Sequence, residues 1–208
     1  MSPKINPVVR ETPTFIEAAR RAQIIEAALA TIADLGFMNA SLAQIARRAG
    51  ISKGVIGYYF PTKDDLVKAV VDSFYMTGHE TMMAQLSTAT TATELLRRYI
   101  THNLAYIDEN RVATRAIGDI IANFRNPDGT NVYQPEDAEP LVAGTAEMFR
   151  WGQQTAEFRE FDVTVMAVML RGCIDAFGNR LNAQPDLDVA LYRDELVAMF
   201  VAATRKTT

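Results

Sequence analysis

Apolar side chains recur along this chain with the period of an α-helix. In the first third, five of them share one helical face: Ile24, Ala28, Leu29, Ile32 and Leu35. We expect this helix to start near Thr14, which forms a capping box with Glu17, and to stop at Gly36. Polar, proline or glycine breaks separate further segments of the same period, at about 62–86, 91–109, 111–124, 136–156, 162–182 and 188–205. Since no stretch alternates like a strand, the sequence predicts an all-α fold of about nine helices.

Between Ser41 and Phe60 the pattern predicts two short helices joined by a tight turn. Ser41, followed by Gln44 three residues later, is a capping box that starts the first helix. Gly50 offers the left-handed backbone that ends this helix, and Ser52 can cap the next one. This arrangement is typical of a helix-turn-helix unit, whose second helix enters the major groove of DNA.

Candidates for DNA contact are the residues of this region that offer a cation, a hydroxyl, an aromatic ring or bare backbone. They are Ser41, Arg47, Arg48, Ser52, Lys53, Gly54, Val55, Gly57, Tyr58, Tyr59 and Lys63. Groups of these kinds bind phosphates and base edges. The alternative is an ordinary helical hairpin in which Arg47, Arg48 and Lys53 form a solvated face. The capping serines and the turn glycine stand in one register, which favours DNA binding.

Several short motifs follow one another in this region. They are ALATIADLGF at 28–37, S-x-x-x-I-A-x-x-A-G at 41–50, S-K-G at 52–54 and Y-Y-F at 58–60 followed by K-x-x-L at 63–66. Through them, residues from about 20 to 74 resemble the N-terminal domain of the TetR family of transcriptional regulators. The resemblance implies a DNA-binding domain at 14–61 and a helical effector-binding and dimerisation domain at 62–208. Gly57 departs from the family pattern, which usually has an aromatic residue at this position.

Charge is divided unevenly along the chain. The net charge of all 208 residues is −4, but residues 1–63 contain eight Lys or Arg and four acids, which leaves +4 there and −8 in the remainder. A basic end on an acidic body is what phosphate binding by that end requires. Residues 1–13 contain three prolines and no apolar period, so they are expected to form a flexible arm. Lys4 and Arg10 could reach DNA from this arm, although a solvated tail is the favoured interpretation.

Two C-terminal helices are apolar on more than half of their circumference, so each lies centrally in a core or pairs with another chain. Together with the resemblance, which implies a four-helix dimer interface, this pattern favours a homodimer. The interface candidates are Val163, Leu170, Phe177, Leu181, Leu191, Met199 and Phe200. Two-fold symmetry would pair two recognition helices with a pseudo-palindromic operator.

Aromatic, Met and isolated polar side chains in the body are candidates for an effector pocket. They are Phe74, Met82, Tyr99, His102, Asn103, Tyr106, Asp119, Phe124, Phe149, Met166, Met169 and Asp175. The alternative for most of them is ordinary core. Arg115 precedes Asp119 and Arg171 precedes Asp175 by four residues, the spacing of helical ion pairs, so the charge of a ligand stays open.

Other classes of function find little support in the sequence. There are two histidines and one cysteine, Cys173, and no cluster of His, Cys and carboxylates has the spacing of a metal site, so we expect neither a metal nor a cofactor nor an enzyme. No apolar run has the length of a membrane helix or a signal peptide, which favours a cytoplasmic protein. The preferred hypothesis is a homodimeric repressor that a small, largely apolar ligand releases from a palindromic operator. A constitutive DNA-binding protein whose body only dimerises is the alternative.

Overall fold

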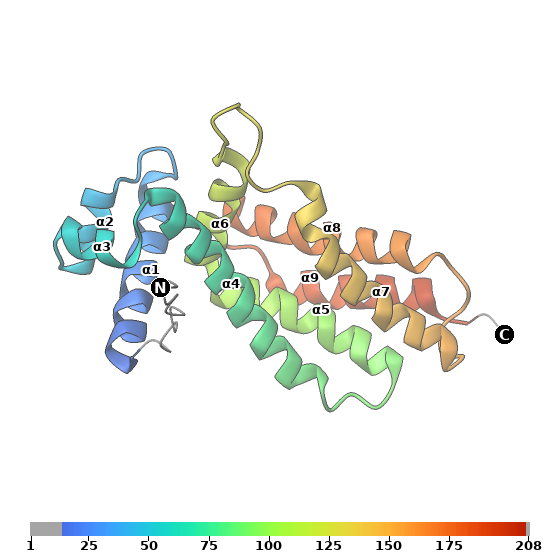
Figure 1. Cartoon of the computed structure of the whole chain (residues 1–208). Coiled ribbons are helices and arrows are strands. Elements are labelled where there is room, and N and C mark those ends of the chain that lie inside the picture. Colours follow the sequence, from blue (N-terminus) through green and yellow to red (C-terminus); the bar gives the residue numbers. More distant parts are fainter. Residues whose placement is uncertain (1–13, 207–208) are drawn as a thin grey trace, which may run out of the picture.

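The computed structural model describes residues 14–206, and these residues form nine α-helices and one short 3-10 helix (Figure 1). The helices are α1 (Phe15–Leu35), α2 (Leu42–Ala49), α3 (Lys53–Tyr59), α4 (Lys63–Leu86), α5 (Ala92–Glu109), α6 (Arg111–Asn123), η1 (Pro135–Ala138), α7 (Glu139–Gln154), α8 (Val163–Ala183) and α9 (Val189–Thr204). The predicted all-α fold is confirmed. The predicted arm at 1–13, with Lys4 and Arg10, lies outside the described residues.

The first helices begin at the caps that the sequence predicts. The Thr14 hydroxyl accepts a hydrogen bond from the Glu17 amide, and the Thr14 amide donates one to the Glu17 carboxylate. Ser41 and Gln44 form the same two hydrogen bonds at the start of α2. Ser52 caps α3 through the Val55 amide. Each cap satisfies amide groups that have no partner inside their helix, so these boundaries follow from local sequence alone.

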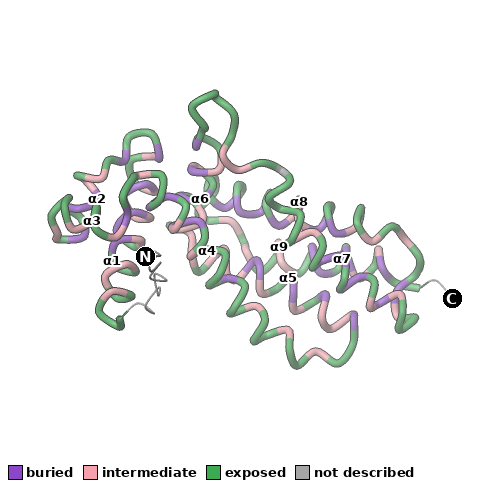
Figure 2. The backbone as a smooth tube through the Cα atoms, viewed as in Figure 1, coloured by how far each residue is buried: buried purple, intermediate pink, exposed green. Residues whose placement is uncertain are grey.

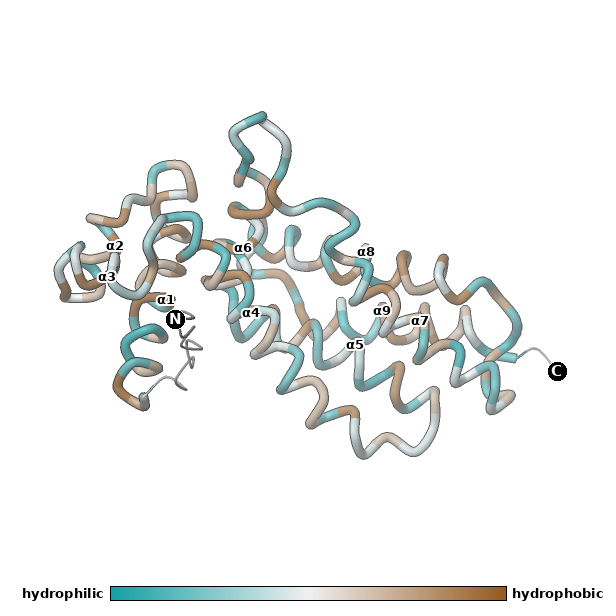
Figure 3. The backbone as a smooth tube through the Cα atoms, viewed as in Figure 1, coloured by the Kyte–Doolittle hydropathy of each residue, from teal (hydrophilic) through white to brown (hydrophobic). Residues whose placement is uncertain are grey.

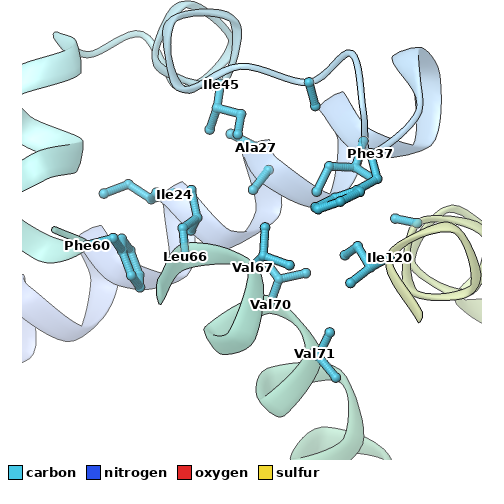
Figure 4. Packing of buried hydrophobic residues seen from close by; sticks show 14 of the residues in the cluster. Ile24, Ala27, Phe37, Ile45, Phe60, Leu66, Val67, Val70, Val71 and Ile120 are labelled. Carbon is cyan, nitrogen blue, oxygen red and sulfur yellow. The ribbon is translucent and has the colours of Figure 1, made fainter. Parts of the chain in front are cut away.

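Helices α1–α3 form a head at one end of the molecule, and α4–α9 form the body (Figure 1). Helix α4 starts in the head and runs into the body, so it belongs structurally to both. The head core consists of buried apolar residues from α1–α4, α6 and the connections that follow α1, α3 and α6. The close-up in Figure 4 shows Ile24, Ile45, Phe60, Leu66 and Ile120 among them. Each fully buried Ile or Leu of this kind contributes about 1.5–3 kcal/mol.

A second cluster, the body core, is built from α5, α7, α8 and α9 (Figure 2). Phe149 and Phe177 are fully buried at its centre. Two short backbone bridges complete the fold: Arg125 pairs with Asn131 after α6, and Phe158 pairs with Arg205 beside the C-terminal end of α9. The bridge at Phe158 ties the connection between α7 and α8 to the last helix, which the sequence pattern did not predict.

One position of the predicted stripe on α1 is wrong. Ile24, Ala28 and Ile32 are buried and Leu29 is half-buried, but Leu35 is 42% exposed. Leu35 is the last residue of α1, and the chain turns away at Gly36, where φ is +81°. The apolar pattern of α1 therefore extends to Leu35, whereas burial against the head core ends near Ile32.

Candidate nucleic-acid interface and its link to the body

The turn between α2 and α3 has the geometry that its residues predict. Gly50 adopts the left-handed conformation, with φ 68° and ψ 30°, and its amide donates to the Ala46 and Arg47 carbonyls. The Ile51 amide then donates to the Ala46 carbonyl at 3.0 Å. Ile56 has no exposed surface and holds one side of α3 against the head core. The short helix is thus fixed in orientation by one buried side chain and a tight turn.

The opposite face of α3 is open to solvent. Lys53, Gly54, Gly57 and Tyr58 are exposed, and each has another of the four three or four residues away, so they form one continuous face. Tyr58 is 75% exposed, which is high for an aromatic side chain. The face therefore combines a cation, an aromatic ring and two positions of bare backbone, as a surface that binds DNA would need.

Two other candidates of α3 are partly covered. Val55 and Tyr59 are half-buried, and the Tyr59 carbonyl accepts a hydrogen bond of 3.0 Å from Arg21. The guanidinium of Arg21 also lies over the Phe60 ring, 4.3 Å from its centroid. These contacts join the end of α3 to α1, so Tyr59 contributes to the packing of the head as well as to its surface.

The arginines of α2 differ in their surroundings. Arg48 forms an ion pair with Asp34 of α1 at 2.5 Å, and Asp34 also lies 3.9 Å from Arg115 of α6. Arg47 is exposed, and no ion pair involves it among the described residues. Since Asp34 compensates the charge of Arg48, Arg47 is the arginine of α2 that carries an uncompensated charge.

Lys63 does not point its amine freely into solvent. Its Nζ donates to the Phe37 carbonyl at 2.9 Å and lies 4.5 Å from the centroid of the Phe37 ring. Burial lowers the pKa of this amine below its ordinary value, although Asp64 opposes that effect. In this conformation Lys63 holds the connection between α1 and α2 against the start of α4.

A carboxylate joins this same connection to the body. The Phe37 amide donates to Asp119 of α6 at 2.5 Å, and the Phe37 ring packs against Phe124 with 5.4 Å between centroids. Asp119 and Phe124 are candidates for the effector pocket, and the structure places both at the contact with the head: Asp119 bonds Phe37, and Phe124 is buried in the head core. The expected helical pair of Arg115 with Asp119 is wrong, because Arg115 approaches Asp34 instead.

Other pocket candidates do come together, around a polar cluster between α5, α7 and α8. The hydroxyls of Tyr99 and Thr145 lie 2.8 Å apart in the body core. Arg171 donates to the Tyr99 hydroxyl at 3.3 Å and to Asn103 Oδ1 at 3.2 Å. The predicted helical pair of Arg171 with Asp175 is confirmed at 3.4 Å. We name Tyr99, Asn103, Thr145 and Arg171 the polar cluster.

The sequence interpretation treated Arg171 only as an ion-pair partner and missed Thr145 altogether. The available signal was an arginine inside the apolar stretch at 163–174. In the structure its side chain turns inward and is 14% exposed, whereas that of Asp175 is 69% exposed. Thr145 gave no such signal, since its hydroxyl also satisfies the Leu141 carbonyl of its own helix.

The remaining aromatic candidates pack between α4 and α5. Tyr106 donates to the Phe74 carbonyl at 2.9 Å, and its ring lies 5.2 Å from that of Phe74 and 6.3 Å from that of His102. Gly78 makes this contact possible, because a Cβ there would lie 3.0 Å from the Tyr106 ring. Met82 lies 3.9 Å from the amide nitrogen of Asn103. Among these side chains, Met82 borders the polar cluster from α4.

Phe149 and Met166 pack with the body core, whereas Met169 is 58% exposed and does not line its interior. Two shallow grooves of about 410 and 330 Å³ flank α1, one beside the junction of α5 and α6 and the other beside α4. Neither groove contains a pocket candidate.

Some of the candidates for the dimer interface are buried within the single chain, and others are exposed. Leu170, Phe177, Leu181 and Phe200 are buried in the body core, so their proposed role in a dimer interface is wrong. Val163 is half-buried, while Leu191 and Met199 are 58% and 60% exposed. The exposed apolar residues of α8 are Val165, Val168 and Met169. The first half of α8 is rich in hydrophobic residues (Figure 3). Because this half is apolar on two faces, the sequence pattern does not show which face packs into the body core.

Within the part of the chain that the structure describes, no helix is long and apolar enough to cross a membrane. Over the same residues, no group of three His, Cys or carboxylate side chains is placed to hold a metal ion.

Comparison with known proteins identifies relatives of the head. A model of the bacterial regulatory proteins of the tetR family matches residues 24–70. The HTH-type transcriptional regulator BetI of Pectobacterium carotovorum is 47% identical over 64 residues, which cover 31% of this chain and 32% of that protein. BetI of Yersinia pestis is 45% identical over 56 residues, covering 27% and 28% of the two chains. The chain thus matches about a third of these relatives' length.

Solved structures resemble the whole fold. A transcriptional regulator from Saccharomonospora viridis in complex with choline has a TM-score of 0.77 at 24% identity, with 91% of this chain and 100% of that chain covered. FadR from Bacillus subtilis in complex with stearoyl-CoA has a TM-score of 0.74 at 20% identity, with 88% and 99% covered. These likenesses extend over head and body, and at such identities they establish the fold alone.

Proposed function

Since its N-terminal helices belong to the tetR family of bacterial regulatory proteins, we propose that this chain is a homodimeric repressor that a small ligand releases from a palindromic operator. The observation that carries the proposal is the open face of α3, held in orientation by Ile56 and the turn at Gly50. A helix presented in this way can enter the major groove while the rest of the head contacts the sugar-phosphate backbone.

The proposed effector site is the polar cluster. Tyr99, Asn103 and Arg171 offer polar contacts beside Met82, a combination that suits a small and largely apolar molecule with one polar group. Two structural neighbours were solved with ligands of different kinds, choline and stearoyl-CoA, which supports ligand binding by the fold without indicating which ligand this chain takes.

A route from that site to DNA is part of the proposal. Helix α6 contacts the head through the hydrogen bond from Phe37 to Asp119 and through Phe124. A shift of α6 upon ligand binding would move the connection between α1 and α2, and with it the recognition helix. The ligand acts in this way only if it binds one position of α6 more tightly than the other.

Dimerisation is proposed through the exposed apolar residues of α8 and α9. Val165, Val168 and Met169 on α8 and Leu191 and Met199 on α9 present apolar surface to solvent in the single chain. A two-fold pair would place the two copies of α3 about 34–36 Å apart, one turn of DNA. A charge at the centre of this surface, as in Met169→Asp, is expected to yield monomers in sedimentation or light scattering and to weaken operator binding.

Selection of bound fragments from a random DNA pool tests the proposed function. We expect enrichment of one inverted repeat, and recovery of no common sequence would contradict sequence-specific binding. Compounds that raise the melting temperature are then added to the operator complex. Release of DNA supports the repressor, whereas binding that no stabilising compound alters favours the alternative, a constitutive DNA-binding protein whose body only dimerises.

Lys53 offers a sharper test of the interface, because it lies on the open face of α3 and takes part in no ion pair among the described residues. Lys53→Ala should weaken binding to all sequences and lower the slope of log affinity against log salt by about one unit. Lys206→Ala removes the same charge near the C-terminus, far from α3 (Figure 1), and should leave the slope unchanged. An unchanged slope in Lys53→Ala would show that this amine does not bind phosphate.

A further inference from the structure

Two of the seven residues of α3 are glycines, and both lie on its open face. Gly54 and Gly57 are three residues apart, so they are neighbours on the helix surface. Glycine is the least favourable residue for a helix interior apart from proline, because it loses the most backbone freedom. A short helix with two glycines on one face therefore needs a reason for both of them.

The folded chain itself gives no such reason. Neither glycine has the positive φ that would exclude other residues. A Cβ at Gly57 would meet nothing within 4 Å, and a Cβ at Gly54 would meet only the Ser52 hydroxyl at 3.7 Å. Alanine fits at both positions without moving a neighbour, so no contact within the described chain accounts for the missing side chains.

Five of the other glycines have a reason inside the fold. Gly36, Gly50 and Gly129 have positive φ, and Gly78 and Gly152 allow the close approach of aromatic rings. Three more, Gly118, Gly144 and Gly172, also leave space for a Cβ, but none of them has a second such glycine on the next turn. The unexplained pair is confined to the helix that the proposed function places in DNA.

The surroundings of the pair indicate what the bare backbone meets. Lys53 and Tyr58 stand on the same face, so a long cation and an aromatic ring border the strip of backbone that Gly54 and Gly57 leave uncovered. Ile56 is fully buried on the other side and fixes the position of α3 against the head core. An added methyl group on the open face would thus push DNA away from the helix.

We propose that Gly57, with Gly54 beside it, is a specificity-determining position at which the backbone of α3 lies directly against base edges in the major groove. This inference rests on the proposed DNA binding. Side chains that reach a base by hydrogen bonds tolerate small shifts of the helix, whereas direct contact of backbone and base depends on the absence of a Cβ. Gly57 is therefore an essential part of the reading surface although it has no side chain.

The test compares Gly57→Ala with Gly144→Ala, a substitution in an exposed part of α7 where a Cβ also meets nothing. Both variants should have a melting temperature equal to that of the parent protein or about 1–4 °C higher, because alanine favours the helix. Gly57→Ala should bind the selected operator at least tenfold more weakly, and Gly57→Leu more weakly again. Gly144→Ala should bind within twofold of the parent protein.

The loss should fall on sequence-specific binding. Affinity for unrelated DNA and the salt slope should stay unchanged in Gly57→Ala, since no phosphate contact is removed. Operator affinity equal to that of the parent protein, or an equal loss on every sequence, would overturn the inference. If the parent protein itself selects no sequence, the proposed function fails first, so the two failures are distinguishable.

Discussion

The head core and the body core bury their polar groups in different ways. Thr31 is the one buried polar residue among the described residues of the head core, and its hydroxyl donates to the Ala27 carbonyl of its own helix at 2.7 Å. In the body, Thr204 likewise bonds only its own helix, but Thr145 bonds Tyr99 of another helix and Asn103 bonds Arg171 of a third. The shape of the head thus depends on apolar packing and caps, whereas hydrogen bonds between helices help to set that of the body.

This difference has a consequence for binding. A side-chain hydrogen bond inside one helix does not set the distance between helices, so its exchange for a bond to a ligand would leave their arrangement unchanged. A bond between helices can be replaced by a ligand group of similar chemistry, and the helices then move apart or together. Under the proposed function, the head would present one rigid surface and the body would change shape when a ligand occupies its polar cluster.

The largest expected loss of stability comes from a substitution in the body core alone. A Cβ at Gly152 would lie 2.1 Å from the Phe158 ring, which is 3% exposed, so Gly152→Ala must displace a buried aromatic side chain. We expect a loss of about 3 kcal/mol in urea unfolding. Gly144→Ala on the same helix is the control and should not destabilise.

Amide hydrogen exchange then shows whether the cores are independent. In Gly152→Ala, exchange of α7 and α8 amides should become faster while that of α1 and α2 amides changes little. Equal acceleration in all of these helices would mean that head and body open as one unit, and the contrast between the two cores would then have no thermodynamic counterpart.

A smaller effect is expected where the cores meet. Asp119→Ala leaves the Phe37 amide without its carboxylate partner, which should cost about 2 kcal/mol in the free energy of unfolding. Asn123→Ala removes an exposed side chain that also bonds Asp119 and should cost less than about 0.5 kcal/mol. If Asp119 couples the body to the head, an effector should release DNA less completely from the Asp119 variant. Release equal to that of the parent protein would exclude this coupling.

The features that could be predicted from the sequence are local ones. Capping boxes at Ser41 and Thr14 and the left-handed Gly50 depend on residues no more than four positions apart, and the structure has all three. The helix boundaries follow from the same short-range signals. For this reason the head, with its dense caps and turns, was described more accurately than the body.

The contacts that the sequence did not predict join residues that lie far apart along the chain. Asp34 and Arg48 are 14 residues apart, Phe37 and Lys63 are 26 apart, and Phe37 and Asp119 are 82 apart, so no periodic pattern connects them. In α8 the difficulty is of another kind. Leu170 and Met169 are adjacent and both apolar, yet one is buried and the other is 58% exposed, because only packing against α5 and α7 decides which face turns inward.

A matched pair of substitutions tests the polar contrast directly. Thr145→Val removes a hydroxyl that bonds across helices and should cost about 1 kcal/mol, because the Tyr99 hydroxyl loses a partner in the body core. Thr31→Val removes a hydroxyl that bonds only its own helix, where the Ala27 carbonyl keeps its position in the helical ladder, and should cost less. Chemical denaturation of both variants measures the difference. Equal costs would show that the two cores use buried hydroxyls in the same way.

The smallest expected effect concerns how helix starts are capped. In the body, the Glu157 carboxylate accepts hydrogen bonds from the Ala92 and Thr93 amides at 2.9 and 3.1 Å, across 65 and 64 residues of chain. Burial raises the pKa of Glu157, but these hydrogen bonds outweigh it and hold the pKa below the ordinary value of 4.5. A carboxylate with a lowered pKa in the folded state stabilises it above the ordinary pKa, and that stability is lost as the pH falls through the lowered value.

Glu157→Gln keeps an acceptor for α5 but cannot titrate. The difference in unfolding free energy between parent and variant should therefore be constant above about pH 5 and should shrink as the pH falls below the ordinary glutamate pKa. Gln44→Ala in the head removes the reciprocal bond of a neutral cap at Ser41, so its cost should not vary over the same range. A cost of Glu157→Gln that stays constant down to pH 3 would show that the carboxylate charge adds nothing to this cap. The carboxylate cap of α5 would then respond to pH no more than the neutral cap at Ser41 does.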